Sequence, residues 1–286
     1  MKNALIDVGS NTIRLVVYDG FKEIENYADH AGLIADVSDG EISPVGIAKI
    51  VRSLGEMKKK ANALGADNIY AFATASLRDI TDKEGLVCLV KAATGIEIEI
   101  ISGDKEAYYD YLGLKMINNL TEGIAFDLGG GSCQLLAFAE ENIRGFVSLP
   151  LGGLKLHRDF VKGNIPDSYE MSEISAFARN KISDFTPFEN CGFEKLYAMG
   201  GSVFTLYNLA KEYFGSEAEL TAETLKKICT LSEDRIYAVA PKRLRSVIPA
   251  ALVMIELLEF SGAKEIVISV AGVRDGVLYS RFSDAK

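Results

Sequence analysis

The feature that most constrains the fold of this chain is a short pattern that occurs twice. An apolar run ends in an aspartate, a turn of glycine and small polar residues follows, and a second apolar run returns. The first copy spans 4–18, with Asp7 and the turn Gly9-Ser10-Asn11-Thr12, and the second spans 123–138, with Asp127 and the turn Gly129-Gly130-Gly131-Ser132. Apolar runs joined in this way predict β-hairpins. The repeat indicates duplicated domains that face each other across a cleft.

The two turns have a functional interpretation and a plain one. Glycine lets backbone N–H groups approach a ligand closely, and a row of such groups forms a concave anion site. An aspartate at a strand end can hold a metal ion or a water on it. Either turn taken alone is equally well explained as a tight hairpin, but its repetition favours phosphate binding.

Length and composition bound the class of protein. The length of 286 residues favours two domains, and we expect them at 1–119 and 120–286, with Asn118-Asn119 as the linker. The net charge of −9 disfavours duplex nucleic acid and anionic membranes as partners. No apolar run reaches the roughly 18 residues of a membrane span, and the N-terminus does not resemble a signal peptide.

Cysteine usage predicts a cytoplasmic protein. Cys88, Cys133, Cys191 and Cys229 are scattered without the spacing of a metal site. We expect them to be reduced and mostly buried, as is usual in the cytosol.

Periodicity and capping signals predict the remaining elements. Ser43-Pro44 has the form of a helix start, and Lys58-Lys59-Lys60 is interpreted as a solvated helix end. Helices are expected from 44, over 84–94, 102–116, 172–182 and 203–214, and from Pro249 to about 259; strands are expected over 69–74, 96–101, 146–149, 196–199 and 265–270, with a turn and short helix over 271–278.

Two charged residues follow strand ends. Arg78 is placed to bind a phosphate with its planar fork, or to form a salt bridge with Asp79 or Asp82. Glu106 lies in the first turn of a helix that Ser102 could cap. A glutamate there is either catalytic or simply favoured by the helix dipole.

Two glycine pairs stand at strand-to-helix junctions. Gly200-Gly201-Ser202 predicts an anion or nucleotide-ribose site at a helix N-terminus. Gly152-Gly153 either brings backbone near a phosphate or forms a plain turn.

Seven motifs follow one another along the chain, at 6–12, 73–78, 101–107, 127–132, 149–152, 200–202 and 272–276. In content and order they resemble those of the Ppx/GppA family of exopolyphosphatases and guanosine-pentaphosphate phosphohydrolases, which belongs to the actin-like, sugar-kinase and heat-shock ATPase superfold. The resemblance covers essentially the whole chain, in the short two-domain form. It implies an α/β fold of two actin-like (ribonuclease H-like) domains with mixed central sheets and an interdomain cleft.

The resemblance implies that water, assisted by Mg²⁺ or Mn²⁺, removes the terminal phosphate of inorganic polyphosphate or a phosphorylated guanosine nucleotide. Glu106 matches the catalytic glutamate, and Asp127 a metal-associated carboxylate; both are candidate metal ligands. Family members often pair, which makes a homodimer an expectation too. The phosphate-binding candidates are Asp7, Gly9, Ser10, Asn11, Thr12, Arg78, Gly129, Gly130, Gly131, Ser132, Gly200, Gly201 and Ser202.

Three departures from the family pattern weaken this assignment. Gln134 stands where the family has a glutamate, and an amide binds a hard cation less well. Because strand residues alternate faces, Gln134 and Ser132 are expected to point the same way. The segment 29–34 lacks the usual basic residue and Gly-Glu-Gly run, and Ser246 and Ala251 replace an acidic residue and a glycine.

Two other functions stay open at this point. A catalytically weakened sensor of phosphate ligands is favoured by Gln134. An actin-like ATPase or small-molecule kinase is supported by the superfold alone.

Overall fold

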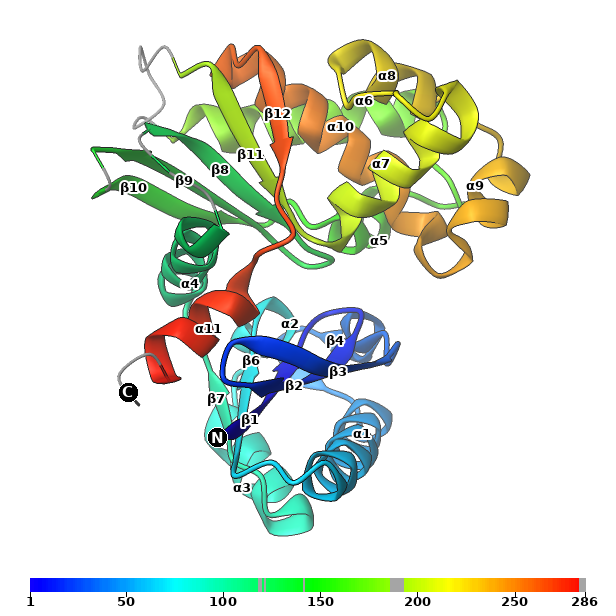
Figure 1. Cartoon of the computed structure of the whole chain (residues 1–286). Helices are drawn as coiled ribbons and strands as arrows, with labels where there is room; N and C mark the ends of the chain where they lie inside the picture. The colour runs from blue at the N-terminus through cyan, green and yellow to red at the C-terminus, as the bar shows by residue number, and fades with distance from the viewer. Residues whose placement is uncertain (118–119, 121, 141, 186–192, 283–286) are drawn as a thin grey trace. The chain divides into compact units, whose positions relative to one another are not determined.

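A computed structural model of the chain describes residues 1–117, 120, 122–140, 142–185 and 193–282 (Figure 1). Its internal contacts divide it into two compact units. The first comprises Met1–Glu106 and the segment from Val277 onward, and the second comprises Ala107–Gly276. The predicted domain limits at 119 and 120 stay a prediction, and the expected linker Asn118-Asn119 lies outside the described residues.

The first unit is built on a five-stranded mixed sheet of order β3-β2-β1-β6-β7. Its first three strands are antiparallel, whereas β6 and β7 run parallel to β1. A small ribbon of β4 (Val37–Ser38) and β5 (Glu41–Ile42) lies outside it. The strands of the sheet are β1 (Lys2–Val8), β2 (Ile13–Asp19), β3 (Lys22–Asp29), β6 (Asn68–Ala73) and β7 (Ile98–Ile100).

The second unit repeats this sheet in the order β10-β9-β8-β11-β12. The repeat extends to the turns, since Gly9 N donates to Thr12 O at 3.1 Å and Gly129 N donates to Ser132 O at 3.0 Å. The duplicated hairpins and the α/β class with mixed sheets are thus confirmed. The strands are β8 (Glu122–Leu128), β9 (Cys133–Ala139), β10 (Asn142–Leu149), β11 (Lys195–Met199) and β12 (Glu265–Ile268).

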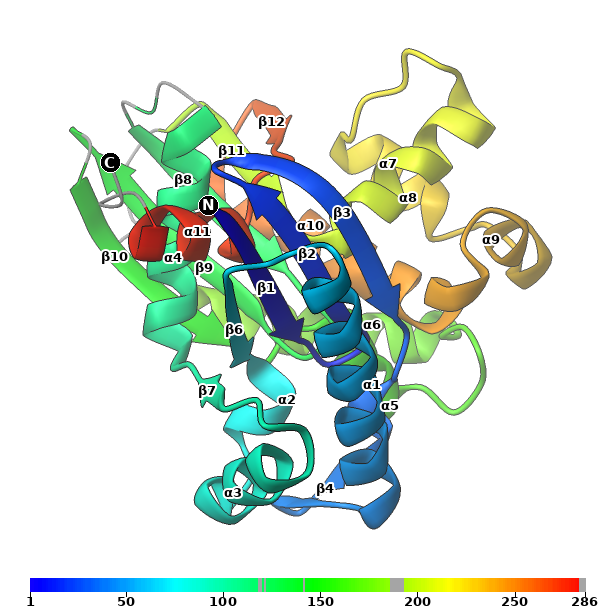
Figure 2. The same cartoon turned by 60° about the horizontal axis from the view of Figure 1, so that its bottom comes forward.

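Helices cover the sheets through apolar faces. In the first unit, Ile50, Leu54 and Met57 of α1 share a buried core with Ile6 and Leu15 of the sheet, and α1 lies along that face in Figure 2. The helical elements that belong wholly to this unit are η1 (Leu33–Asp36), α1 (Pro44–Ala63), α2 (Ala75–Arg78) and α3 (Lys83–Thr94).

The second unit is organised around α10, whose residues from Ser246 to Leu257 are buried. This helix packs against α5, α6, α7 and α8. Two further helices, α4 (Gly103–Ile117) and α11 (Val273–Phe282), have residues in both units. The helices of the second unit are α5 (Gly153–Phe160), α6 (Ser168–Ser183), α7 (Gly201–Phe214), α8 (Ala222–Ile228), α9 (Glu233–Val239), η3 (Pro241–Arg243) and α10 (Leu244–Ser261).

The expectation that Pro249 begins the long apolar helix was wrong. The helix α10 begins at Leu244, and Pro249 lies inside it. A proline within a helix removes one backbone hydrogen bond. Burial of nearly the whole apolar helix offsets that loss.

The three lysines lie in the last two turns of α1, which ends at Ala63, and Lys59 and Lys60 are exposed, so the interpretation as a solvated helix end is confirmed for these two. Two of the lysines also have partners. Lys58 donates to Thr94 O at 2.8 Å, and the ammonium of Lys60 lies over the Tyr27 ring, 4.1 Å from its centroid. The polar stretch after Gly20 contains the strand β3, which the sequence did not predict.

The cysteines in the described residues are free, as expected, but not uniformly buried. Cys133 is buried, Cys229 is half-buried and Cys88 is exposed, while Cys191 lies outside the described residues. Burial raises the pKa of the Cys229 thiol to about 12. Among the described helices, none is long and apolar enough to cross a membrane.

Candidate active site

In the first unit, the turn after β1 is held by its carbonyl groups. Gly32 N donates to Asn11 O and Ile34 N donates to Ser10 O, each at 2.9 Å. The N–H groups of Ser10 and Asn11 donate no hydrogen bond to other described residues. The carbonyl groups of Ser10 and Asn11 are thus bonded to the segment 32–34, and the N–H groups of the same two residues can bind an anion.

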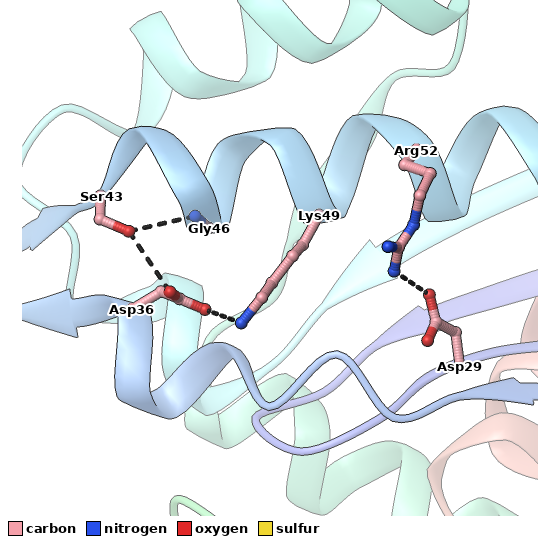
Figure 3. A network of polar contacts seen from close by, with 6 residues as sticks. All are labelled: Asp29, Asp36, Ser43, Gly46, Lys49 and Arg52. Carbon is pink, nitrogen blue, oxygen red and sulfur yellow. Dashed lines mark hydrogen bonds and ion pairs between the residues drawn. The ribbon is translucent and has the colours of Figure 1, made fainter.

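The segment that closes this turn is fastened to α1 by two aspartates (Figure 3). Asp29 accepts hydrogen bonds from Ser53 Oγ at 2.5 Å and Arg52 at 3.0 Å, and Asp36 accepts one from Lys49 at 2.7 Å. The bond from Ser53 foremost lowers the pKa of the Asp29 carboxyl. This segment departs from the family pattern, and its acidic residues are held by α1.

Next to Asp29, the segment also approaches the turn itself. His30 Nδ1 lies 3.3 Å from the hydroxyl of Thr12. His30 is exposed and places its imidazole at the edge of the turn.

Arg78 and Glu106 form a bonded pair in the first unit. Arg78 Nη1 donates to Glu106 Oε2 at 2.7 Å, and the side chains are 18% and 7% exposed. Among the described residues, no ion pair joins Arg78 to Asp79 or Asp82, and Asp82 instead caps α3 by accepting from Gly85 N at 2.8 Å. Ser102 caps α4 as predicted, since its hydroxyl accepts from Lys105 N at 3.2 Å.

The strand order brings these groups to one edge of the first sheet. The strands β1, β6 and β7 are parallel neighbours, and Ile101 N extends the ladder by donating to Ala73 O at 3.0 Å. Their carboxyl ends are therefore adjacent. The Gly9 turn follows β1, Arg78 follows β6 and Glu106 follows β7, which is the arrangement in which open α/β sheets bind ligands.

In the second unit, Asp127, Gln134 and Ser148 lie opposite one another on β8, β9 and β10. The Gln134 amide donates from Nε2 to Ser132 Oγ at 2.7 Å and to Ser148 Oγ at 3.0 Å. The prediction that Ser132 and Gln134 point the same way is confirmed. Gln134 is only 1% exposed, so it supports the turn from beneath.

The start of α5 holds the second turn as the segment 32–34 holds the first. Gly153 N donates to Gly129 O at 3.1 Å, and Leu154 N donates to Gly130 O at 3.0 Å. A side chain on Gly152 would collide with the backbone of Gly130 and Gly131. The glycine pair 152–153 thus packs against the turn 129–132 and supports it.

The junction Gly200-Gly201-Ser202 lies beside Asp127. Gly200 has a φ of 98°, and a Cβ there would collide with Asp127 Oδ1 and come within 2.7 Å of Leu128 O. Ser202 Oγ is buried without a hydrogen-bond partner among the described residues. The structure therefore brings this predicted site together with the aspartate of the second hairpin.

Sequence reasoning missed Arg243 at this junction. Its guanidinium lies against Gly201, whose added Cβ would come within 2.9 Å of the Arg243 Cζ. The sequence signal was the basic run Lys242-Arg243-Leu244-Arg245. It went unused because the long helix was expected to begin only at Pro249.

The residues present fit a hard cation that is shared with a phosphate ligand. Within the described residues, no three His, Cys, Asp or Glu side chains gather around one point. The row of Asp127, Gln134 and Ser148 carries oxygen donors, and Mg²⁺ commonly uses one or two carboxylates together with substrate phosphates. The two proposed ligands are Asp127 and Glu106, and Glu106 Oε2 is bonded to Arg78.

Each unit thus assembles its own half of the predicted site. The first holds Asp7, the turn 9–12, Arg78 and Glu106, and the second holds Asp127, the turn 129–132 and the junction 200–202. That the two halves converge on one cleft stays a prediction.

Two sheets of the same strand order and turn pattern define an actin-like α/β protein, and solved structures share this fold. An exopolyphosphatase from Cytophaga hutchinsonii has a TM-score of 0.89 at 19% identity, covering 100% of this chain and 99% of its own. The Ppx/GppA protein of Aquifex aeolicus has a TM-score of 0.80 at 24% identity, with the same coverage.

The chain belongs to the Ppx/GppA phosphatase family, whose model matches residues 34–285. Exopolyphosphatase 1 of Mycobacterium leprae is 27% identical over 64% of this chain and 57% of its own length. A bifunctional 3-dehydroquinate synthase/phosphatase of Fusobacterium nucleatum is 26% identical over 93% of this chain and 44% of its own. The chain therefore spans about half the length of these curated relatives. The family and fold inferred from the sequence motifs are confirmed.

Proposed function

We propose that this protein is a phosphohydrolase that removes the terminal phosphate of inorganic polyphosphate or of a guanosine pentaphosphate-type nucleotide. The observation that carries the proposal is the bonded pair of Arg78 and Glu106 at the carboxyl ends of the parallel strands of the first sheet. Membership of the Ppx/GppA family supports it. So do relatives named exopolyphosphatase and, at 22% identity in Aeromonas hydrophila, guanosine-5'-triphosphate,3'-diphosphate pyrophosphatase.

In this proposal Glu106 accepts a proton from the attacking water. Arg78 donates to its Oε2 at 2.7 Å and so orients the carboxylate, which in turn orients the water. The water oxygen forms a bond to the terminal phosphorus while the bridging P–O bond breaks, so the products are phosphate and the shortened anhydride. Arg78 carries a planar fork of five N–H donors, and in this proposal its guanidinium also binds phosphate oxygens.

The glycine turns position the phosphates. Backbone N–H groups at Ser10, Asn11, Gly130 and Gly131 supply donors without a side chain that must be ordered. Mg²⁺ or Mn²⁺, held by Asp127 and Glu106, would neutralise phosphate charge when bound. Positioning and charge neutralisation provide most of the catalysis in phosphoryl transfer.

The test measures phosphate release from polyphosphate, guanosine pentaphosphate and ATP side by side. Glu106→Gln should lower turnover by roughly 10²–10⁴-fold and leave ligand binding nearly intact, because the amide is close in shape but takes no proton. Glu223→Gln, at an exposed position of α8 in the second unit, is the matched control. Turnover of Glu106→Gln near the wild-type rate would reduce Glu106 to a carboxylate favoured by the helix dipole.

A sensor of phosphate ligands is the second candidate, and the buried Gln134 favours it. An amide occupies the position of a family glutamate and is bonded to two hydroxyls. Tight binding of polyphosphate with no release of phosphate at any metal concentration is the outcome that selects the sensor. Release from ATP alone would instead select an actin-like ATPase or kinase.

A further inference from the structure

The carboxylate of Glu99, on β7, receives hydrogen bonds from three side chains of the first unit. Lys105 donates to Oε1, while Tyr70 donates to Oε2 at 2.7 Å and Arg281 to Oε2 at 2.5 Å. The Arg281 guanidinium also lies over the Tyr70 ring, with its Cζ 3.7 Å from the centroid. Charge-assisted bonds of this kind are stronger than neutral ones.

The carboxyl group of Glu99 is ionised at neutral pH. Burial of Glu99 opposes its ionisation, but hydrogen bonds from Lys105 and Tyr70 outweigh that effect and lower the pKa of its carboxyl. Ionised Glu99 therefore attracts both cations. This differs from an isolated surface ion pair, which contributes little because a single contact cannot fix two long side chains.

One donor of the network stands next to the proposed catalytic glutamate. Lys105 and Glu106 lie in the first turn of α4, where Ser102 O accepts from Glu106 N at 3.0 Å. Ser102 thus caps the backbone of this turn, and Glu99 binds the Lys105 side chain within it. The position of the Glu106 carboxylate depends on both anchors.

The other cation lies at the end of α11, a helix that also contacts α4 in the second unit. A Cβ on Gly276 would collide with Tyr109 O, and a Cβ on Gly113 would lie 2.5 Å from Gly272 O. The backbones of the two helices therefore touch at the beginning of α11, and Glu99 joins their ends through Arg281 and Lys105. The helix α11 is tied to α4 at both of its ends.

We propose that Arg281 is a positioning residue for Glu106, acting through Glu99 and Lys105 on the first turn of α4. This inference rests on the proposed function of Glu106. Small displacements of a reacting group are costly, since a shift of about 1 Å can cost as much as roughly 10²-fold in rate. Arg281 does not touch the substrate in this proposal, so its loss should change kcat and leave KM unaltered.

The activity test uses the whole chain with Arg281→Gln and Arg281→Lys. Arg281→Gln should lower kcat about fivefold, which corresponds to about 1 kcal/mol, with KM unchanged. Arg281→Lys keeps the charge and should recover part of the rate. Lys264→Gln is the matched control, because its ion pair with Glu194, at 2.8 Å, lies on the surface of the second unit.

A second readout does not depend on activity. Hydrogen exchange of the amides of 103–107 should be faster in Arg281→Gln than in the wild type, and unchanged in Lys264→Gln. Combining Arg281→Gln with Lys105→Gln should lower kcat by less than the product of the single effects, because both act through Glu99. Tyr70→Phe removes one bond to Glu99 and serves in place of Arg281→Gln if that variant does not fold.

The outcomes separate this inference from the proposed function. A wild-type protein that releases phosphate from none of the three substrates overturns the function, and exchange at 103–107 still decides whether Arg281 fixes that turn. Unchanged exchange and unchanged kcat in Arg281→Gln overturn the positioning role. A fall in melting temperature with kcat intact overturns it equally, because the contact is then structural only.

Discussion

At the scale of single residues, Gly200 combines a positive φ with a crowded Cβ position. Its φ of 98° lies in the region that favours glycine, and the space of a Cβ is taken by Asp127 and Leu128. Gly215 offers a matched control, because its φ is 115° but nothing lies within 4 Å of the added Cβ. The pair separates backbone strain from displacement of Asp127.

We expect both Gly200→Ala and Gly215→Ala to lose about 1–3 kcal/mol of stability from backbone strain. Only Gly200→Ala should also lose phosphate release, because its methyl group pushes Asp127 aside. Chemical denaturation and a turnover assay measure the two effects. Equal turnover in both variants would contradict a role for the position of Asp127.

We expect Gln134 to limit how strongly the second unit holds a cation. We expect Gln134→Glu to lower the metal concentration needed for half-maximal phosphate release, because carboxylates bind hard cations better than amides. Ser132 and Ser148 can reverse their hydroxyls and donate to the new carboxylate. A metal titration of both proteins is the measurement. Brisk wild-type release at low Mg²⁺ without a gain in the variant removes the main argument for a sensor.

At the scale of elements, α1 supports the first glycine turn indirectly. The helix binds the segment 29–36 through Asp29 and Asp36, and this segment donates backbone hydrogen bonds to the turn carbonyls. The corresponding task in the second unit belongs to α5, which makes such bonds with its own first residues. The two units therefore secure equivalent turns by different means.

Asp36→Ala tests this indirect support. Removal of the partly buried carboxylate leaves Lys49 without its bond, and we expect a loss of about 1–2 kcal/mol of stability. Phosphate affinity should fall as well, because Ile34 N then holds Ser10 O less firmly. Calorimetry and thermal denaturation provide the measurements. Lys227→Gln, which breaks an exposed pair on α8, should change neither quantity appreciably.

At the scale of the whole molecule, global stability should depend on His157. This buried side chain donates from Nε2 to Gly163 O at 3.0 Å and lies 3.1 Å from Asn164 O. Burial foremost lowers its pKa, and the positive charge of Arg245 acts in the same direction. The unfolded chain therefore takes up the proton at a higher pH than the folded protein does.

Stability should accordingly decrease as the pH falls below about 6.5, the ordinary pKa of histidine. In that range the unfolded state binds more protons, so the slope of unfolding free energy against pH is positive. Urea denaturation between pH 7.5 and 5.0 should show a smaller decrease for His157→Gln than for the wild type. Parallel curves for the two proteins would show that another group controls this range.

The sequence by itself determined the local architecture of both units. The alternation of apolar residues and the turn chemistry at Gly9 and Gly129 predicted both hairpins, and Ser43 and Ser102 predicted helix starts. These signals succeed because hairpin register and helix caps depend on hydrogen bonds between residues close in the chain. The motif order then identified the family.

Only the tertiary structure decided which distant residues meet. Arg78 is bonded to Glu106 rather than to a nearby aspartate, Gly152 lies beneath Gly130, and Arg243 lies against Gly201. The helix α10 continues through Pro249 because its burial outweighs one missing hydrogen bond. Such outcomes depend on how elements far apart in the sequence pack together, and a local pattern carries no record of that packing.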